Sequence, residues 1–449
     1  MTSALARTPP ATPGLPFIGS LYRMMFDPLH YLQEVPPTHG GLVKLGRAAG
    51  RAVYLVTDAE MLKEVLTQPD RFLSGPVKAF FKPLFRDGLV TSDGAAWRQQ
   101  RKLIQPSFHP RRLAAAQPRM ARTIAAGMES WSSDIDAGSV VDMYELLNQI
   151  SMRVVLDAIF DLPGAPPEAL ELGTSVGSAM DYLYDAFWRP YLPPRWVPTP
   201  RNRRFARNLA AIDACVGALI EQRSGDSSGD DLLSILCRAL GSADGLPREE
   251  VVGHLVSIII GGFETTALVM TYALHLVHAH PDVKAQLVSE VDRVLGGDLP
   301  TVEHIEQLVY TRQVLDESMR IYPPAWLFGR TPAKDEALGG FAVPADANLL
   351  ISPWAVHHRP DYWPDPERFD PSRFAADSGV DRHPFSYIPF GGGPRFCVGR
   401  NLALMEGVLL LAMFIQRFEY RTVRPERFSL VPGVTLRPAE GLPMVLTRR

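Results

Sequence analysis

Apolar residues recur every three to four positions through most of the chain, a spacing that predicts amphipathic α-helices. The longest such pattern covers residues 249–280 and stops at Pro281, and the pair Pro323-Pro324 follows the pattern over 302–322. Because proline lacks a backbone donor and blocks the preceding turn, both sites predict helix ends. The other predicted helices cover residues 59–67, 96–105, 111–130, 143–160, 167–186, 201–222, 231–239, 282–295 and 402–414.

Short runs of β-type sequence mark a smaller second portion. They predict strands over residues 53–56, 340–343 and 348–352 and within the tail 434–446. Residues 78–93 mix aromatic, glycine and charged residues and predict an irregular loop, and five prolines between Pro190 and Pro200 predict a candidate lid loop. We therefore expect a mainly α fold with a small β region: a proline-rich arm over 1–20, then a single domain over 21–449.

Composition narrows the functional classes. With 449 residues, 46% of them hydrophobic, the chain can bury a large core. A net charge of −3 without a basic tail gives no sign of a nucleic-acid partner. The three cysteines are Cys215, Cys237 and Cys397, an odd and sparse set that fits a reducing cytoplasm better than a disulfide framework.

Neither a signal peptide nor a membrane anchor is expected. The first ten residues contain no apolar core of signal-peptide length. The two most apolar stretches, 255–276 and 402–414, are interrupted by Glu264 and His275 and by Glu406 respectively. Neither is an uncharged run long enough for a transmembrane helix.

Cys397 lies where the glycine-rich loop from Gly391 to Gly393 leads into a helical pattern. Backbone N–H groups and the positive end of a helix favour a thiolate at such a position. A single thiolate can ligate haem iron. A zinc knuckle or local disulfide is excluded, since no other cysteine lies within a hundred residues. The plainer alternative is a buried structural cysteine beside a glycine turn.

Two further motifs are candidates for a chemical role. The longest predicted helix contains Gly261-Gly262-Phe263-Glu264-Thr265-Thr266, in which each glycine costs roughly 1 kcal/mol relative to alanine and the polar groups must find partners. In the plain alternative the threonines bond back to helix carbonyls and Glu264 is solvated. The second motif, a G-x-S-x-G match around Ser175, lies inside the helical pattern 167–186 and lacks the preceding strand of a serine hydrolase, which favours coincidence.

The loop from Phe390 to Gly399 resembles the haem-binding signature of the cytochromes P450, a family that this chain matches in order from Trp97 onwards. The resemblance implies haem b enclosed between the long central helix and the helix after the cysteine loop, with Cys397 as metal ligand. It implies that Glu264 and Thr265 form an acid–alcohol pair on the oxygen-binding side, and that Glu317, Arg320 and Arg368 form a buried charge network. The other cofactor-binding residues implied are Trp97, Arg101, Arg330, Phe390, Gly391, Arg395 and Gly399.

The same resemblance implies a bacterial haem-thiolate monooxygenase that inserts one oxygen atom of O2 into a C–H bond of an apolar molecule. Electrons are expected from NAD(P)H through a ferredoxin and its reductase, and the enzyme is expected to be a cytoplasmic monomer. A basic ferredoxin-docking face, or simply solvated surface, would comprise Arg98, Lys102, Arg111, Arg112 and Arg400.

Residues in the substrate-contacting regions of the family predict a pocket for a compact, neutral terpenoid from a secondary-metabolite or antibiotic pathway. The alternative is a fatty-acid hydroxylase with the carboxylate held by Lys78, Lys82 or Arg86, and an alternative of another class is a non-catalytic haem-binding sensor or carrier. The predicted pocket residues are Phe80, Phe81, Phe85, Ile258, Gly262, Trp326, Phe328, Val434 and Leu436.

Overall fold

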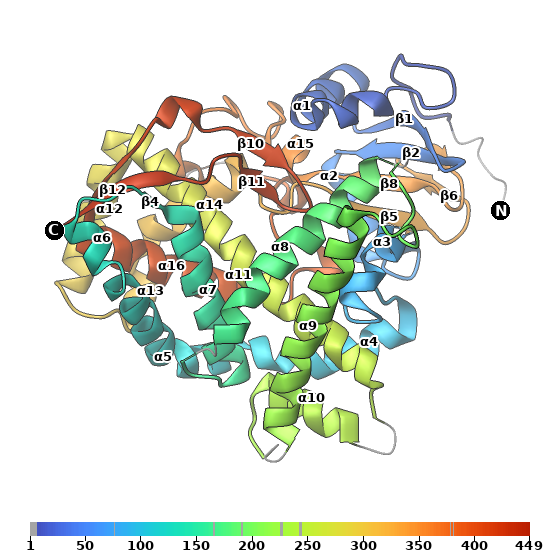
Figure 1. The fold of residues 1–449 in the computed structure, drawn as a ribbon. Helices are drawn as coiled ribbons and strands as arrows, with labels where there is room; N and C mark the ends of the chain where they lie inside the picture. Colours follow the sequence, from blue (N-terminus) through green and yellow to red (C-terminus); the bar gives the residue numbers. More distant parts are fainter. Residues whose placement is uncertain are drawn as a thin grey trace.

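The computed structural model describes residues 7–449 except 76, 165–166, 190–191, 225–227, 242–244, 378 and 380; Pro190 of the predicted lid loop therefore lies outside the described residues. Helices dominate, as the periodicity predicts (Figure 1). They are α1 (Pro28–His39), α2 (Ala59–Thr67), α3 (Val77–Phe85), α4 (Gly94–Ile104), α5 (Pro110–Glu129), α6 (Ser132–Asp136), α7 (Met143–Phe160), α8 (Pro167–Trp188), α9 (Pro200–Ser224), α10 (Leu232–Gly241), α11 (Arg248–Ala279), α12 (Pro281–Leu295), α13 (Val302–Gln307), α14 (Val309–Ile321), α15 (Pro353–His357) and α16 (Arg400–Arg417).

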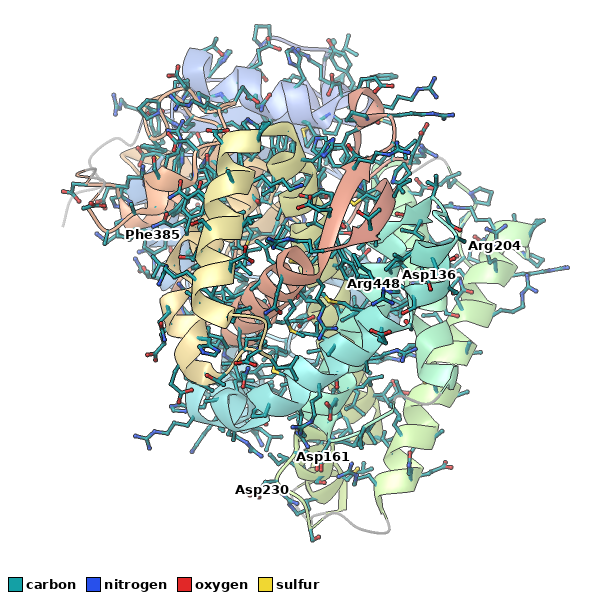
Figure 2. The ribbon with its side chains drawn as sticks, turned by 90° about the vertical axis from the view of Figure 1, so that its left-hand side faces the viewer. Asp136, Asp161, Arg204, Asp230, Phe385 and Arg448 are labelled. Carbon is teal, nitrogen blue, oxygen red and sulfur yellow. The ribbon has the colours of Figure 1, made fainter. Side chains whose placement is uncertain are left out.

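Helix α11 forms the centre of the molecule. It is apolar around most of its circumference and runs unbroken for 32 residues, packing against α7, α14 and α16. A helix that is apolar on all sides is stable only where other elements cover it. Figure 1 shows it crossing the middle of the helical part, and in Figure 2 side chains fill the space between helices while Arg204 and Asp230 lie at the outer edge.

Length and apolar composition would allow α11 to cross a membrane, and among the described residues no other helix has both properties. In the fold, 72% of its most apolar window is buried inside the molecule. Its hydrophobicity is thus that of a central core helix.

The β portion is split into small sheets. The largest has the order β1-β2-β8-β5-β3, in which β2 and β8 are parallel and the other neighbouring pairs are antiparallel. The rest of the described β portion is a three-stranded sheet with the order β4-β12-β9 and the two hairpins β6-β7 and β10-β11. The bounds are β1 (Leu42–Ala48), β2 (Arg51–Val56), β3 (Phe72–Leu73), β4 (Val141–Asp142), β5 (Phe328–Pro332), β6 (Glu336–Leu338), β7 (Phe341–Val343), β8 (Asn348–Ile351), β9 (Phe418–Thr422), β10 (Leu430–Pro432), β11 (Leu436–Pro438) and β12 (Pro443–Arg448).

From residue 7 to residue 20 the proline-rich arm has no helix, but it lies on the folded body. The Arg7 amide donates to the Gly340 carbonyl, and the Lys44 amide of β1 donates to the Pro10 carbonyl. The Ser20 hydroxyl donates to the Leu45 carbonyl at 3.0 Å. The described part of the arm is therefore tied to the sheet by backbone hydrogen bonds.

Two local predictions are wrong. Much of the expected loop over 78–93 is helix α3, because Phe81 and Phe85 recur at helical spacing and pack on the core despite Pro83. The single helix expected over 302–322 is two helices that meet at Leu308, whose ψ of 58° leaves the helical region.

A carboxylate from another helix explains this break. Glu290 of α12 accepts the N–H groups of Tyr310 and Thr311, each at 2.7 Å, and the Thr311 hydroxyl at 2.8 Å. These N–H groups lie in the first turn of α14 and have no partner within the helix. Glu290, 20 residues before Tyr310 in the chain, thus caps the N-terminus of α14.

We predict that Glu290→Ala lowers the free energy of unfolding by about 1–3 kcal/mol, since it leaves buried donors without an acceptor. Urea unfolding monitored by circular dichroism measures this. Glu306→Ala, at an exposed position of α13, is the control and should change stability by less than about 0.5 kcal/mol. Equal effects of the two variants would contradict the capping role.

Candidate active site

A cavity of about 590 Å³ lies between α11 and the loop that precedes α16. Cys397 lines it from the loop, and Gly261, Gly262 and Thr265 line it from α11. Aromatic side chains from α3 and β5 and the aliphatic Met180 from α8 close further sides. The predicted position between the central helix and the cysteine-loop helix therefore holds a large cavity.

The backbone of the cysteine loop is fixed by close packing. Gly393 has a φ of +63°, and a Cβ atom there would lie 2.0 Å from the Leu66 carbonyl oxygen, so only glycine fits. The Cys397 amide donates to the Phe390 carbonyl at 2.9 Å, and Gly399 is the N-cap of α16. Sequence alone predicts this loop-to-helix transition, and the structure has it.

The thiol environment is only partly as predicted. Cys397 is exposed towards the cavity, but the surrounding protein still buries the sulfur enough to raise the pKa of the thiol. The N–H groups of Gly399 and Arg400 and the charge of Arg101 oppose that rise without overcoming it. Without a metal the protein therefore favours the thiol, and a bound metal would have to displace its proton.

Three arginine side chains gather beside the cavity. Arg101 donates to the Phe396 carbonyl at 2.9 Å, and its Nη2 atom has no hydrogen-bond partner. Arg395 lies over the Trp97 ring at 4.7 Å and pairs with Asp93 at 3.1 Å. Burial lowers the pKa of Arg330 to about 10. Within the described residues no carboxylate lies at ion-pair distance from Arg101 or Arg330, so the cluster has an excess of positive charge.

These residues fit a haem group. The excess cations would hold its two propionates, and Trp97 and the sulfur of Cys397 line the same cavity. The loop glycines let the backbone approach a flat ring closely. All the predicted cofactor-binding residues thus line one cavity, Gly391 and Gly399 through their backbone.

On α11 the plain alternative is correct for the two threonines and wrong for Glu264. Thr265 donates to the Gly261 carbonyl at 2.8 Å and Thr266 to the Gly262 carbonyl at 3.1 Å, the back-bonding of the plain alternative. Glu264, however, is buried and ion-paired with Arg437, whose Nε lies 2.6 Å from its Oε1. Gly262 allows α7 to pack closely, since a Cβ there would lie 2.7 Å from Val155.

The predicted charge network needs one correction. Glu317 and Arg320 are fully buried and pair at 2.7 Å, and burial raises the pKa of Glu317 although Arg320 opposes it. The prediction for Arg368 is wrong: its side chain is 69% exposed and pairs with Asp370. The third cation is Arg373, 10% exposed and 3.4 Å from Glu317. Arg368 contributes its backbone carbonyl, which accepts from Arg320 at 3.2 Å.

Comparison with known proteins decides the family. The sequence model of the Cytochrome P450 family matches residues 9–441. The chain belongs to the cytochrome P450 family. Its fold is therefore that of the haem-binding P450 monooxygenases. A crystal structure of a cytochrome P450DA heme domain superposes on it with a TM-score of 0.85 at 25% identity, and the superposition covers 99% of this chain and 98% of that one.

Three of the similar proteins come from Streptomyces. Cyclooctat-9-en-7-ol 5-monooxygenase of Streptomyces melanosporofaciens is 34% identical over 97% of this chain and 94% of its own length. Cyclooctatin synthase of the same organism is 34% identical, over 95% and 91%. Pentalenene oxygenase of Streptomyces avermitilis is 32% identical over 92% of this P450 and 91% of that protein.

Most predicted substrate-contacting residues line the P450 cavity: Phe81, Phe85, Ile258, Gly262, Trp326, Phe328 and Val434. Two do not. Phe80 lies on the outer side of α3 and is 40% exposed, and Leu436 points into the core beside β8, so that Thr435 lines the cavity instead. In each case the prediction chose the wrong face of a short element.

Sequence reasoning missed the contribution of α8. Met180 and Tyr184 line the cavity one helical turn apart, and the amphipathic spacing of 167–186 could have indicated an inward face. The hydroxyl-bearing Ser175 lies within the same helix and so lacks the strand–turn–helix setting of a hydrolase nucleophile.

We predict that Glu317→Ala destabilises the P450 by about 3–5 kcal/mol, because Arg320 is left buried and unpaired. Arg373→Ala should cost about 1–3 kcal/mol through the lost charged contact, and Arg368→Ala less than about 0.5 kcal/mol. Thermal unfolding and the yield of haem-loaded protein measure the series. A larger effect at Arg368 than at Arg373 would restore the original assignment.

Proposed function

We propose that this P450 hydroxylates a compact, polycyclic terpenoid, with Cys397 as the protein ligand to haem iron. The observation that carries the proposal is the cavity that Cys397, Phe81, Phe85, Trp326 and Phe328 line together. Such a surface binds a neutral, apolar ligand. Support comes from the relatives, whose names specify oxidation of cyclooctat-9-en-7-ol and of pentalenene.

The bound haem supplies the oxygen-activating chemistry, and the protein supplies binding, orientation and protons. Aromatic and aliphatic walls hold the substrate by shape and exclude water. Thr265 lines the cavity and carries a hydroxyl that can pass a proton inward, and the neighbouring Glu264 receives protons from the solvent side. The Glu264–Thr265 pair favours an enzyme over a sensor or carrier, since a protein that only binds has no use for proton delivery.

A fatty-acid substrate is the second candidate, but its proposed anchors are already paired. Lys78 binds Asp93 at 2.8 Å, Lys82 binds Asp87 at 2.8 Å and Arg86 binds Asp213 at 2.6 Å. Of these cations Lys78 alone lines the cavity. A fatty-acid carboxylate would have to displace Asp93, which also supports Arg395.

Electron supply completes the proposal. We infer a cytoplasmic monomer that receives electrons from NAD(P)H through a ferredoxin and its reductase. The exposed Lys102, Arg111 and Arg400 support a basic docking face. Arg98 pairs with Asp70 at 2.7 Å and Arg112 bonds to the Asp230 carbonyl, so these two contribute less free charge than the sequence suggests.

Cys397→Ala is expected to remove the strongly red-shifted Soret band of the ferrous–CO complex, because no other thiolate borders the cavity within the described chain. The difference spectrum of reduced, CO-treated protein measures this. Cys237→Ala, buried elsewhere, should keep the band. Persistence of the band in Cys397→Ala would show that another ligand holds the iron.

Thr265→Ala is expected to bind haem and substrate normally while diverting electrons to peroxide. The substitution removes a hydroxyl of a residue that lines the cavity and leaves the apolar walls in place. General acid–base groups typically contribute about 10²–10⁴-fold. Product and peroxide formed per NADPH consumed give the partition. An unchanged product yield would assign proton delivery to another group.

The substrate class is tested by titrating sesquiterpenes, diterpene alcohols and long-chain fatty acids against the purified P450 and following the haem spin-state shift. We expect tighter, larger shifts with terpenoids and little change in them on Lys78→Ala. Products of reconstituted turnover with the best ligand then establish hydroxylation. Tighter fatty-acid binding that is lost in Lys78→Ala would reverse the assignment.

A further inference from the structure

The turn between α3 and α4, residues 86–93, forms one wall of the P450 cavity. Leu89 and Val90 line the cavity from this turn, and Val90 is also 49% exposed to solvent. The wall thus separates the cavity from the outside. Because the turn belongs to neither a helix nor a sheet, its position depends on contacts with the helices around it.

The turn meets α11 backbone to backbone. A Cβ atom on Gly253 of α11 would lie 2.4 Å from the Phe85 carbonyl oxygen, and a Cβ atom on Gly88 would lie 2.8 Å from the carbonyl carbon of Gly253. Neither position therefore has room for a side chain. This close approach brings the amide of Leu89 within hydrogen-bond distance of His254, the next residue of α11.

His254 holds the middle of the turn. Its side chain is fully buried, and its Nδ1 atom accepts the Leu89 N–H at 3.2 Å. A backbone N–H can only donate, so Nδ1 must carry a lone pair and the proton of the neutral ring must lie on Nε2. Burial lowers the pKa of His254 to about 4, so the ring stays neutral near pH 7 and keeps its acceptor.

The two ends of the turn are held by Gln100 of α4. This side chain donates to the Asp87 carbonyl at 2.9 Å and accepts the Ser92 hydroxyl. Helix α4 also carries two of the cofactor-binding residues, so the ends of the turn are placed relative to the haem site. The height of the wall between these ends then depends on the bond from Leu89 to His254.

The other ring nitrogen shows that this bond is the reason for a histidine here. Nε2 lies 3.6 Å from Oε1 of Glu250 and has no hydrogen-bond partner among the described residues. Burying an unpartnered N–H costs free energy that a leucine at the same place would not cost. What a leucine could not supply is the acceptor for Leu89.

We propose that His254 is a positioning residue that fixes the wall formed by Leu89 and Val90 and thereby limits the shape of substrate that the cavity accepts. The inference rests on the proposed function, in which this cavity holds the substrate. The cavity of about 590 Å³ must contain the haem as well as the substrate. A bulky ligand therefore has to push the wall outward, and doing so breaks the bond from Leu89 to His254.

Amide hydrogen exchange of residues 86–92 in the haem-loaded protein without substrate tests the first step. We expect His254→Leu to speed exchange about three- to tenfold, the effect of one lost hydrogen bond. His254→Asn should restore the slow exchange. The amide oxygen of asparagine is attached to Cγ, as Nδ1 is in histidine, so it can accept the Leu89 N–H.

Two azole ligands of different size test the effect on the cavity. 4-Phenylimidazole is compact and clotrimazole is bulky, and each binds haem iron through an imidazole nitrogen and shifts the Soret band. In His254→Leu we expect clotrimazole to bind about three- to tenfold more tightly relative to 4-phenylimidazole, since moving the wall no longer breaks a hydrogen bond. A merely structural role would weaken both azoles alike.

His275→Leu is the matched control. His275 lies about 30 Å further along the axis of the same helix. Its ring stacks on Phe428 at 3.8 Å, and burial lowers its pKa to about 4 as well. This variant should change neither the exchange of residues 86–92 nor the ratio of the azole affinities.

Three results would overturn the proposal: unchanged exchange in His254→Leu, an equal change in the affinity of both azoles, or a failure of His254→Asn to restore the wild-type values. If His254→Leu yields no haem-loaded protein, His254→Gln replaces it. The amide of glutamine is attached one carbon further out, so it keeps a polar group near Glu250 without an acceptor at the place of Nδ1.

A last readout joins the wall to catalysis. During turnover of the best terpenoid, His254→Leu should oxidise additional positions of the substrate, whereas His254→Asn should keep the wild-type product pattern. An unchanged pattern in His254→Leu would overturn the link to specificity. The exchange and azole measurements need no turnover, so if no terpenoid is oxidised the proposed function fails while the role of His254 is still tested.

Discussion

The buried ion pair of Glu317 and Arg320 holds together the parts of the chain that shape the cavity. Arg320 donates to the His357 carbonyl at 3.0 Å, and Glu317 accepts the Asp370 amide at 3.0 Å. The His357 ring in turn accepts the amide of Ile388 at 2.9 Å, two residues before Phe390. A continuous set of hydrogen bonds thus fixes the position of the cysteine loop relative to α14.

Such a pair is costly to bury, and an apolar pair of the same volume would often be as stable. Its value here is geometric. A carboxylate and a guanidinium that are both fully buried accept only one arrangement of donors and acceptors, so segments 37 to 53 residues apart in sequence meet in one register. An apolar contact would allow these loops to slide, and the sulfur of Cys397 would lose its fixed place.

Around the cavity the protein combines apolar walls with unbalanced charge. The buried guanidinium groups of Arg101 and Arg330 are poorly compensated, and burial lowers the pKa of both. A dianionic haem relieves this imbalance, so cofactor binding and stability of the fold should be linked. On the opposite side, Arg437 is compensated twice over. Arginine therefore serves as an anchor for the cofactor at one end of the cavity and as a link between α8 and α11 at the other.

Local spacing in the sequence predicts the central helix, the cysteine loop and the family. The relevant signals are the apolar periodicity over 249–280 and the glycines at fixed offsets from Cys397. Sequence reasoning also placed most cofactor-binding residues, since they lie within such motifs. It failed at Arg368, Phe80 and Leu436, where the choice between neighbouring side chains depends on which face of a short segment meets the core. It gave no sign that Glu290 begins α14, or that Arg437 joins α8 to α11. Those contacts link residues 20 to 256 positions apart, and only the packing of one element on another decides which charged groups meet.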